Sequence, residues 1–288
     1  MRNPSRPQRP AGRAAIARLI QPTACLLATC AASAASAQYV DATLPTTKMR
    51  PVVTPDTTAT VKSDGVWRYA ISGGASFARG NSDSTTANAR VDAAQATATT
   101  KWTLYGRALY AKSEGEKTGD QLAAGTRYDA DLNPKWFTFG QFDALRDEPA
   151  NLDYRATIAA GGGNHLVRTD ENSWDLLFGL AYSFDRYTRL TDINDQLRNS
   201  YGRVELVLGE ESGHKLSDTT SFRQRLLIYP NLRDSGQVRG NFDAGLAVAM
   251  TKTLSLTAGL TVRYDSAPGR DVKKTDTLFV TGVSYKLD

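Results

Sequence analysis

The chain has 288 residues, of which 41% are hydrophobic and 23% charged, with a formal net charge of +5 and a sequence pI near 9.1. This length suits one large all-β domain or two ordinary domains. The positive charge comes from five arginines at the N-terminus, within a segment that we expect to be removed, so the pI gives no support to a nucleic-acid partner.

The first 37 residues have the three parts of a secretory signal peptide. A modest apolar stretch, Leu19 to Ala32, is followed by the small-residue cleavage site Ala35-Ser36-Ala37. The positive region in front of it is formed by Arg2, Arg6, Arg9, Arg13 and Arg18. We therefore predict export and a mature chain that begins at Gln38. Five of the 35 basic residues and none of the 30 acidic ones lie in this leader, which leaves 30 of each and a formally neutral mature chain.

Both cysteines, Cys25 and Cys30, also lie in the leader, so the mature chain has no disulfide, thiolate ligand or cysteine nucleophile. The run Leu27 to Cys30 loosely resembles a lipoprotein cleavage box. Thr29 fits that box poorly, and the Ala-Ser-Ala site lies beyond it, so we favour cleavage after Ala37. Residues 38–64 contain Pro45, Pro51 and Pro55 among many threonines and are predicted to be a flexible linker.

From Val66 onward, twelve segments with a hydrophobic period near two alternate with turn residues, which predicts twelve β-strands in a domain of residues 65–288. No segment after the leader approaches the ~20 consecutive apolar residues of a membrane-spanning helix. We place connections at 79–83, 99–100, 113–117, 133–134, 147–151, 168–171, 189–195, 211–214, 231–236, 251–252 and 267–273. The odd-numbered connections are mostly longer and charged, which is typical of outer-membrane barrels.

The alternation is clearest in two segments. Trp174, Leu176, Phe178, Leu180, Tyr182 and Phe184 share one face, and Leu254, Leu256, Ala258, Leu260, Val262 and Tyr264 share another. These faces run about 12 residues, longer than the ~9–11 residues that a tilted strand needs to cross the hydrocarbon layer. Two solvents, lipid outside and water or packed polar groups inside, account for the low mean hydropathy of −0.40. The sequence thus predicts a twelve-stranded antiparallel transmembrane β-barrel of the outer-membrane type.

The four tryptophans fall at the beginning of alternate strands, which predicts an aromatic girdle at one membrane interface. They are Trp67, Trp102, Trp136 and Trp174. With the apolar face outward, we expect charged side chains to line the lumen: Arg107, Arg127, Asp129, Arg155, Asp175, Arg203, Glu205, Arg223, Arg225, Arg239, Asp243, Arg263 and Asp265. Eight cations then face five acids, which allows either a plugged, ion-paired lumen or a weakly anion-preferring pore. The register of the segment at Trp136 is open, because Phe137 and Phe139 oppose that tryptophan.

Several short blocks resemble a known family. They are Trp67 to Asn88, Lys135 to Gly140, Arg155 to Gly163, Tyr264 to Pro268 and Thr275 to Thr277. Together they are similar to domain of unknown function family 481, the salt-induced outer-membrane proteins, over about residues 66–287. The resemblance implies a Gram-negative outer-membrane barrel that responds to osmotic conditions, and it brings no catalytic residues. The chain departs from most such barrels by ending on Asp288 rather than on an aromatic residue.

The sequence gives little sign of chemistry. The mature chain has two histidines, His165 and His214, which we place in periplasmic connections, and Ser212 close to His214 is explained by turn polarity. The cluster Asp192, Asn194 and Asp195 lacks the glycine and terminal glutamate of a calcium loop. Gly161 to Gly163 precede no helix that could hold a phosphate. We therefore expect no enzyme activity, no cofactor and no metal.

We expect outer-membrane lipid as the surroundings of the barrel, and the barrel insertion machinery and periplasmic chaperones as partners during assembly, with no nucleic acid. The sequence leaves the oligomeric state open. Two other functions remain as alternatives. A soluble periplasmic β-barrel that binds an apolar ligand predicts extraction by salt alone. A lipid-modifying barrel enzyme predicts an activity that depends on His165 or His214.

Overall fold

The computed structural model describes residues 57–78, 83–193, 196–268 and 272–287. The predicted signal peptide, residues 38–56 of the predicted linker, and residues 79–82, 194–195, 269–271 and 288 lie outside these ranges. The strands are β1 (Arg68–Ala78), β2 (Ser84–Ala96), β3 (Thr100–Ser113), β4 (Glu116–Asp131), β5 (Trp136–Asp147), β6 (Leu152–Arg168), β7 (Asn172–Ile193), β8 (Gln196–Lys215), β9 (Thr220–Pro230), β10 (Val238–Ala249), β11 (Leu254–Asp265) and β12 (Thr275–Leu287).

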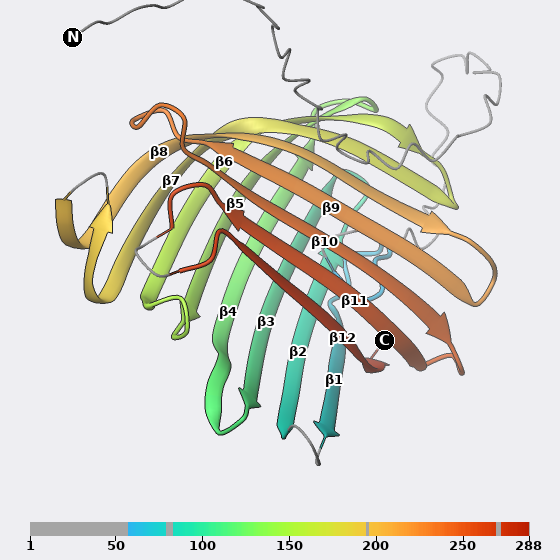
Figure 1. Ribbon diagram of the computed structural model, residues 1–288. Helices are drawn as coiled ribbons and strands as arrows, with labels where there is room; N and C mark the ends of the chain where they lie inside the picture. Colours follow the sequence, from blue (N-terminus) through green and yellow to red (C-terminus); the bar gives the residue numbers. More distant parts are fainter. Residues whose placement is uncertain (1–56, 79–82, 194–195, 269–271, 288) are drawn as a thin grey trace, which may run out of the picture. The chain divides into compact units, whose positions relative to one another are not determined.

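The twelve strands form one closed antiparallel barrel in which every strand pairs with its neighbours in sequence. The wall closes where β1 pairs with β12, in the register Ile71 opposite Tyr285 (Figure 1). Closure leaves no free sheet edge, so the backbone groups of the wall are paired. The predicted fold class is confirmed. No helix in the described part of the chain is long and apolar enough to cross a membrane.

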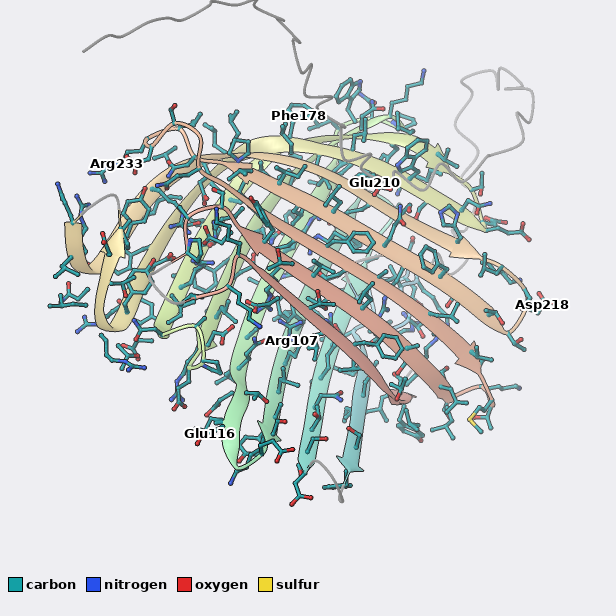
Figure 2. The ribbon with its side chains drawn as sticks, viewed as in Figure 1. Arg107, Glu116, Phe178, Glu210, Asp218 and Arg233 are labelled. Atoms are coloured by element: carbon teal, nitrogen blue, oxygen red, sulfur yellow. The ribbon has the colours of Figure 1, made fainter. Side chains whose placement is uncertain are left out.

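Side chains alternate between the two faces of each strand, as the period of two predicts. On β7, Phe178 and Leu180 point outward and are 48% and 54% exposed, whereas Ser183 and Asp185 point inward and are fully buried. Figure 2 shows Phe178 on the outer surface and Arg107 within the barrel. Large apolar residues therefore lie outside, and much of the polar surface lies inside.

The interior is not uniformly polar. A cluster of buried apolar residues fills the lumen beside β5 to β9: Phe137, Phe139, Ala159, Leu177, Ala181, Val207, Leu227 and Tyr229. This cluster settles the register of β5, because Trp136 is exposed while Phe137 and Phe139 face inward. These uncharged side chains therefore fill part of the lumen.

Two glycines on β6 allow close packing with the neighbouring strands. Phe137 lies opposite Gly163, and Phe139 lies opposite Gly161. A Cβ at Gly163 would lie 2.2 Å from the Phe137 ring, and a Cβ at Gly161 would lie 2.1 Å from the carbonyl oxygen of Phe178. Gly161 is thus needed for the close approach of β6 to β7, and Gly163 leaves room for the Phe137 ring.

Three predicted connections are wrong in position. Residues 211–214 and His165 lie within β8 and β6, because the long strands continue past these polar residues. Most of 189–195 belongs to β7, and the 113–117 connection is reduced to the turn Glu114-Gly115, in which both residues have positive φ. The long β7–β8 hairpin extends beyond the ends of β6 and β9. The wall of the barrel therefore projects further at the end where β7 and β8 are connected.

Residues 57–64, at the end of the predicted linker, pack against the inner wall; we refer to them as the strap. Ala59 and Val61 are buried against Ala70, Ala94 and Ala96 of β1 and β2. The strap is anchored at its end by Asp64, whose carboxylate accepts hydrogen bonds of 2.8 and 2.6 Å from Arg68. These bonds hold the pKa of Asp64 well below its ordinary value. The linker prediction does not describe these eight residues, because they find apolar and polar partners inside the barrel.

Candidate functional site: the barrel lumen

A cavity of about 340 Å³ lies inside the barrel, between β2, β3 and β5 on one side and β9 to β12 on the other. It extends from Thr58 of the strap to Pro268 and Lys273 in the β11–β12 connection. The charged residues that line it are Arg90, Arg107, Asp143, Asp147, Arg155, Arg223, Arg225, Arg239, Asp243, Arg263, Asp265, Lys273, Lys274 and Asp276. Nine basic and five acidic groups thus face the same space.

The strap narrows this cavity at one end. Thr58 donates a 2.5 Å hydrogen bond to Asp92 of β2, and Arg223 of β9 donates a 2.9 Å bond to the carbonyl oxygen of Thr57. β2 and β9 lie on either side of β1 and β10 to β12 in the wall, so the strap spans part of the lumen. The opposite end of the cavity is lined by the β11–β12 connection.

Most of the lining arginines are neutralised by acids behind them in the wall. Arg90 makes two hydrogen bonds of 2.8 and 2.7 Å with Asp92. Arg225 contacts Glu211 at 2.8 Å and donates to Gln141. The guanidinium groups therefore lie closer to the cavity than the carboxylates that balance them.

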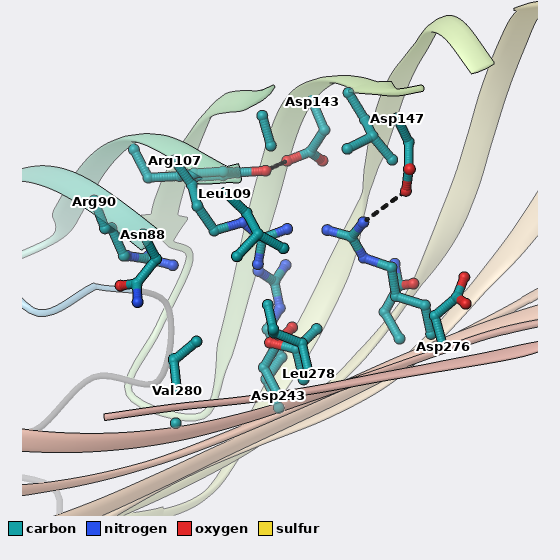
Figure 3. A pocket seen from close by; sticks show the side chains of 18 of the residues that line it. Asn88, Arg90, Arg107, Leu109, Asp143, Asp147, Asp243, Asp276, Leu278 and Val280 are labelled. Atoms are coloured by element: carbon teal, nitrogen blue, oxygen red, sulfur yellow. Dashed lines mark hydrogen bonds and ion pairs between the residues drawn. The ribbon is translucent and has the colours of Figure 1, made fainter. Parts of the chain in front are cut away.

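Arg107 of β3 differs from these arginines. Among the described residues it has no ion pair and no hydrogen bond, and its Nε is buried without a partner. Its neighbour on β2 is Arg90, and its neighbour on β4 is Ala123. Figure 3 shows Arg107 extending into the space in front of Leu278 and Val280 of β12. An unpaired guanidinium is thus available to a solute in the cavity.

The acids of the cavity are partly occupied. Asp143 accepts a 2.7 Å hydrogen bond from the Tyr105 hydroxyl, drawn as a dashed line at Asp143 in Figure 3, and another from Gln141. Asp243 accepts a 2.7 Å bond from Thr261. Arg263 reaches Asp147 only at 3.9 Å. The loosest charge pairing in the cavity is therefore around Arg107 and Arg263.

A second part of the lumen is closed by a compact ionic cluster. Glu205 is fully buried and accepts hydrogen bonds from Arg203 at 3.1 Å, from Arg239 at 2.9 Å and from Ser183 at 2.7 Å. The adjacent Asp185, also fully buried, receives two 2.6 Å bonds from Arg155. Each carboxylate has at least two charged partners, as burial of a charge requires.

A similar cluster joins β3, β4 and β8. Arg127 contacts Glu211 at 2.6 Å and Asp129 at 2.8 Å, and Lys101 contacts Asp129 at 3.3 Å. The Arg127 guanidinium also lies 5.1 Å from the centre of the Phe139 ring. This cluster joins the apolar packing of β5 to the charged wall.

The thirteen residues expected in the lumen are divided by the fold into two groups. The cavity is lined by Arg107, Arg155, Arg223, Arg225, Arg239, Asp243, Arg263 and Asp265. The others are Arg127, Asp129, Arg203 and Glu205, which belong to the ionic clusters, and Asp175, which bonds to His165 at 2.7 Å. The alternation in the sequence does not distinguish the open part of the interior from its filled part, and the role of these residues in a passage stays a prediction.

The expected count of eight cations and five acids is incomplete, because the interior also contains further charged residues of both signs. Ion pairs or the cavity also involve Asp92, Asp143, Asp147, Asp185, Glu211 and Asp276. Glu211 and Asp147 lie on strands β8 and β5, although the sequence predicts connections at 211–214 and 147–151, and Asp143 lies on β5, whose register the sequence leaves open. Asp185 follows the inward alternation of β7, a signal that could have identified it.

Each of the two histidines has hydrogen-bond partners within the described residues. His165 lies in β6, bonds to Asp175, approaches Asp131 at 3.4 Å, and stacks on Phe137 at 4.6 Å between ring centres. His214 lies in β8 and bonds to Asn172 at 2.8 Å. In the described ranges, no group of three or more histidine, cysteine or acidic side chains could hold a metal ion.

Three of the four tryptophans project outward, with exposed fractions of 43–44% for Trp102, Trp136 and Trp174. Trp67 directly precedes β1 and lies 5.9 Å from Trp102 between ring centres. The four residues begin alternate strands and thus lie near the same end of the barrel as the strap. Their place at a membrane interface stays a prediction.

Comparisons with known proteins place these features in a family context. Residues 71–287 match the family described as "Protein of unknown function, DUF481". The "Uncharacterized protein YdiY" of Escherichia coli (strain K12) is 24% identical over 190 residues, which cover 66% of this chain and 71% of that protein.

Two solved structures are also similar. A structure of the NanC porin is 12% identical, covers 76% of this chain and 100% of its own, and has a TM-score of 0.46. The translocator domain of the autotransporter NalP from Neisseria meningitidis is 14% identical, covers 76% and 86%, and has a TM-score of 0.41. Likenesses this distant carry no information on function.

Proposed function

We propose that this chain, which belongs to the DUF481 family of proteins of unknown function, is a non-enzymatic outer-membrane barrel with a narrow, weakly anion-preferring passage. The observation that carries the proposal is the arginine-rich cavity enclosed by a barrel whose outer face is apolar. Lipid is the solvent that suits such an outer face, because exposed Leu, Phe and Val side chains are unfavourable in water.

The preference for anions is expected to be weak. Nine basic and five acidic groups line the cavity, but Asp92, Asp185, Glu205 and Glu211 neutralise four of the arginines from within the wall. Guanidinium groups at the surface of the passage still lie nearer to a passing ion than these carboxylates. Rings of side-chain charge set ion selectivity in pores, and the nearest charges have the largest effect.

The passage is expected to be narrow as well. The apolar cluster around Phe137 and Leu177 and the ionic cluster around Glu205 fill the side of the lumen next to β5 to β9. The strap crosses one end of the remaining space. Solutes therefore have only the space between β2, β3 and β10 to β12, and conductance is expected to be small.

The test is the reversal potential of the refolded protein in a planar bilayer under a KCl gradient. We expect a weak preference for chloride in the wild type and a shift toward cation preference in Arg107→Glu and Arg263→Glu. Arg146→Glu is the matched control, because Arg146 is 54% exposed and lies outside the cavity lining. The proposal would be refuted if the wild type conducts and the Arg107→Glu and Arg263→Glu variants have the same reversal potential as the wild type and the control.

The response to salt implied by the family resemblance is a separate proposal. It predicts that the amount of protein in the outer membrane changes with the osmolarity of the medium. Quantitative immunoblotting of membrane fractions from cells grown at low and high NaCl measures this. Equal amounts under both conditions would contradict it without affecting the proposed passage.

A further inference from the structure

We infer that the cavity binds a small organic carboxylate, held at Arg107 and with its apolar part against Leu109, Leu278 and Val280. This inference deepens the proposed function, because it names the class of solute that the passage would accept. Binding to the cavity is nevertheless measurable at equilibrium, whether or not the barrel conducts.

The first step of the argument is the charge of Arg107. An unpaired cation inside a protein is unfavourable, and the other inward arginines named above have anionic, amide or carbonyl partners. Arg107 has no hydrogen bond or ion pair among the described residues, and its Nε is buried. A like charge, Arg90, lies directly opposite it on β2, where cross-strand repulsion is unfavourable. Asp243 and Asp147 attract Arg107 through space but form no ion pair or hydrogen bond with it, so an anion in the cavity would supply the direct partner that this guanidinium lacks.

The second step concerns a neighbouring donor. The hydroxyl of Ser72 on β1 also lines the cavity, and its Oγ is buried without a partner in the described part of the chain. Ser72 lies opposite Arg90, which in turn lies opposite Arg107. Ser72, Arg90 and Arg107 thus form a row across three neighbouring strands, and none of the three is acidic. At the usual spacing of strands, the Cα atoms of Ser72 and Arg107 are about 10 Å apart. This row offers hydrogen-bond donors to an anion over the width of two strands.

The third step is the apolar surface beside these donors. Leu109 follows Arg107 on the same face of β3, and Leu278 and Val280 lie across the cavity on β12 (Figure 3). Ligand pockets commonly combine an apolar lining with a few polar groups that fix orientation. The volume of about 340 Å³ is at the lower end of the range for such pockets. A small molecule with one anionic end and an apolar body matches this surface.

The fourth step decides between one negative charge and several. Asp143, Asp243 and Asp276 share the cavity with Arg107, and they would repel a phosphate or another polyanion. A carboxylate has a single charge and two oxygens that match the planar fork of a guanidinium. The lining therefore favours a monoanionic carboxylate over phosphate.

The experiment is isothermal titration calorimetry of the full mature chain, refolded in detergent, with three probes. Benzoate is the carboxylate, benzamide is its neutral counterpart of the same shape, and inorganic phosphate tests a general anion site. The variants are Arg107→Gln and Arg107→Lys, with Arg146→Gln as a control that removes an exposed charge elsewhere. Arg107→Gln leaves no carboxylate without a partner, so we expect it to fold, which heat-modified mobility on gels checks for each variant.

We expect benzoate to bind the wild type and the Arg146→Gln protein equally, and benzamide and phosphate to bind at least about tenfold more weakly. Arg107→Gln should weaken benzoate about tenfold or more, and Arg107→Lys should fall between, because lysine retains the charge but loses the bidentate geometry. Equal benzoate affinity in the wild type and in folded Arg107→Gln would overturn the inference, as would the absence of benzoate binding or phosphate binding of equal strength. Conduction without benzoate binding would reject the inference alone, and benzoate binding in a silent barrel would reject the passage alone.

Discussion

Removing one partner of the buried Glu205 cluster should strongly destabilise the barrel. Arg239→Gln takes two hydrogen bonds and a positive charge from Glu205, which is fully buried. Hydrogen bonds to a charged group contribute about 1.5–3 kcal/mol each, so two of them amount to about 3–6 kcal/mol. This agrees with the ~3–5 kcal/mol lost when one member of a buried ion pair is removed. We therefore expect the free energy of unfolding to fall by about 3–5 kcal/mol.

A double-mutant cycle makes this expectation more specific. Glu205→Gln alone leaves Arg203 and Arg239 without their carboxylate, and it should lower the free energy of unfolding by an amount similar to that for Arg239→Gln. The double variant Arg239→Gln/Glu205→Gln removes one charge of each sign, so its loss should be smaller than the sum of the two single losses by about 2–3 kcal/mol. The measurement is equilibrium urea unfolding in lipid vesicles, followed by tryptophan fluorescence.

Arg186→Gln serves as the control for this cycle. Arg186 and Asp153 form an exposed pair at 3.8 Å, with 58% and 51% of their side chains accessible. Loss of such a pair should change stability by less than about 1 kcal/mol. The reasoning would be refuted if Arg239→Gln behaved like this control, or if the losses in the Glu205 cycle were additive.

Three further predictions concern packing, the strap and the tryptophans. Gly161→Ala should lower the free energy of unfolding by about 1–3 kcal/mol, because its Cβ would lie 2.1 Å from a backbone oxygen. Gly140→Ala should be nearly neutral, because its Cβ would have no atom within 4 Å. The same urea titration compares the two variants. The Asp64–Arg68 pair should protect the Gly65 amide from hydrogen exchange at neutral pH. Because the pKa of Asp64 is lowered in the folded protein, the stabilisation from this pair is complete above the ordinary pKa of 3.8. It is lost as the pH falls through the lower pKa of the folded protein. Arg68→Gln should remove this pH dependence, and unchanged protection in that variant would contradict it. Trp67, Trp102, Trp136 and Trp174 should be quenched most strongly by lipids brominated near the headgroup, and strongest quenching by bromine at the end of the acyl chain would exclude a common interface.

The sequence was sufficient for the barrel because a period of two is a direct consequence of strand geometry. Phe178 and Asp185 on β7 follow it, since the first side chain is exposed on the outer face and the second is fully buried inside. The period cannot say what fills the interior, since Leu177 and Phe137 are apolar on the inward face and conflict with the simple rule. The Phe137 ring fits because Gly163 of the neighbouring strand has no side chain, a relation between distant positions that the alternation of one strand does not contain.

In the candidate site, too, the sequence does not show which partners a side chain has. Arg107 and Arg239 look alike in the sequence, as inward arginines of β-strands. They differ because Glu205 lies within reach of Arg239, whereas Arg107 lies opposite Arg90. The strap is a further case, because its small and polar residues resemble a linker until the inner wall supplies partners. Pairing across the lumen thus decides which charges are structural and which are available to a solute.

The most direct test of the passage compares single-channel conductance of the mature chain with that of a chain lacking residues 57–63. These residues include Thr57 and Thr58, which bond to Arg223 and Asp92 at one end of the cavity, while the anchor at Asp64 is kept. We predict small, weakly anion-preferring steps in the wild type and larger steps with the same preference after the deletion. A folded barrel that remains silent in both forms, or whose steps prefer cations, would contradict an arginine-lined passage narrowed by the strap.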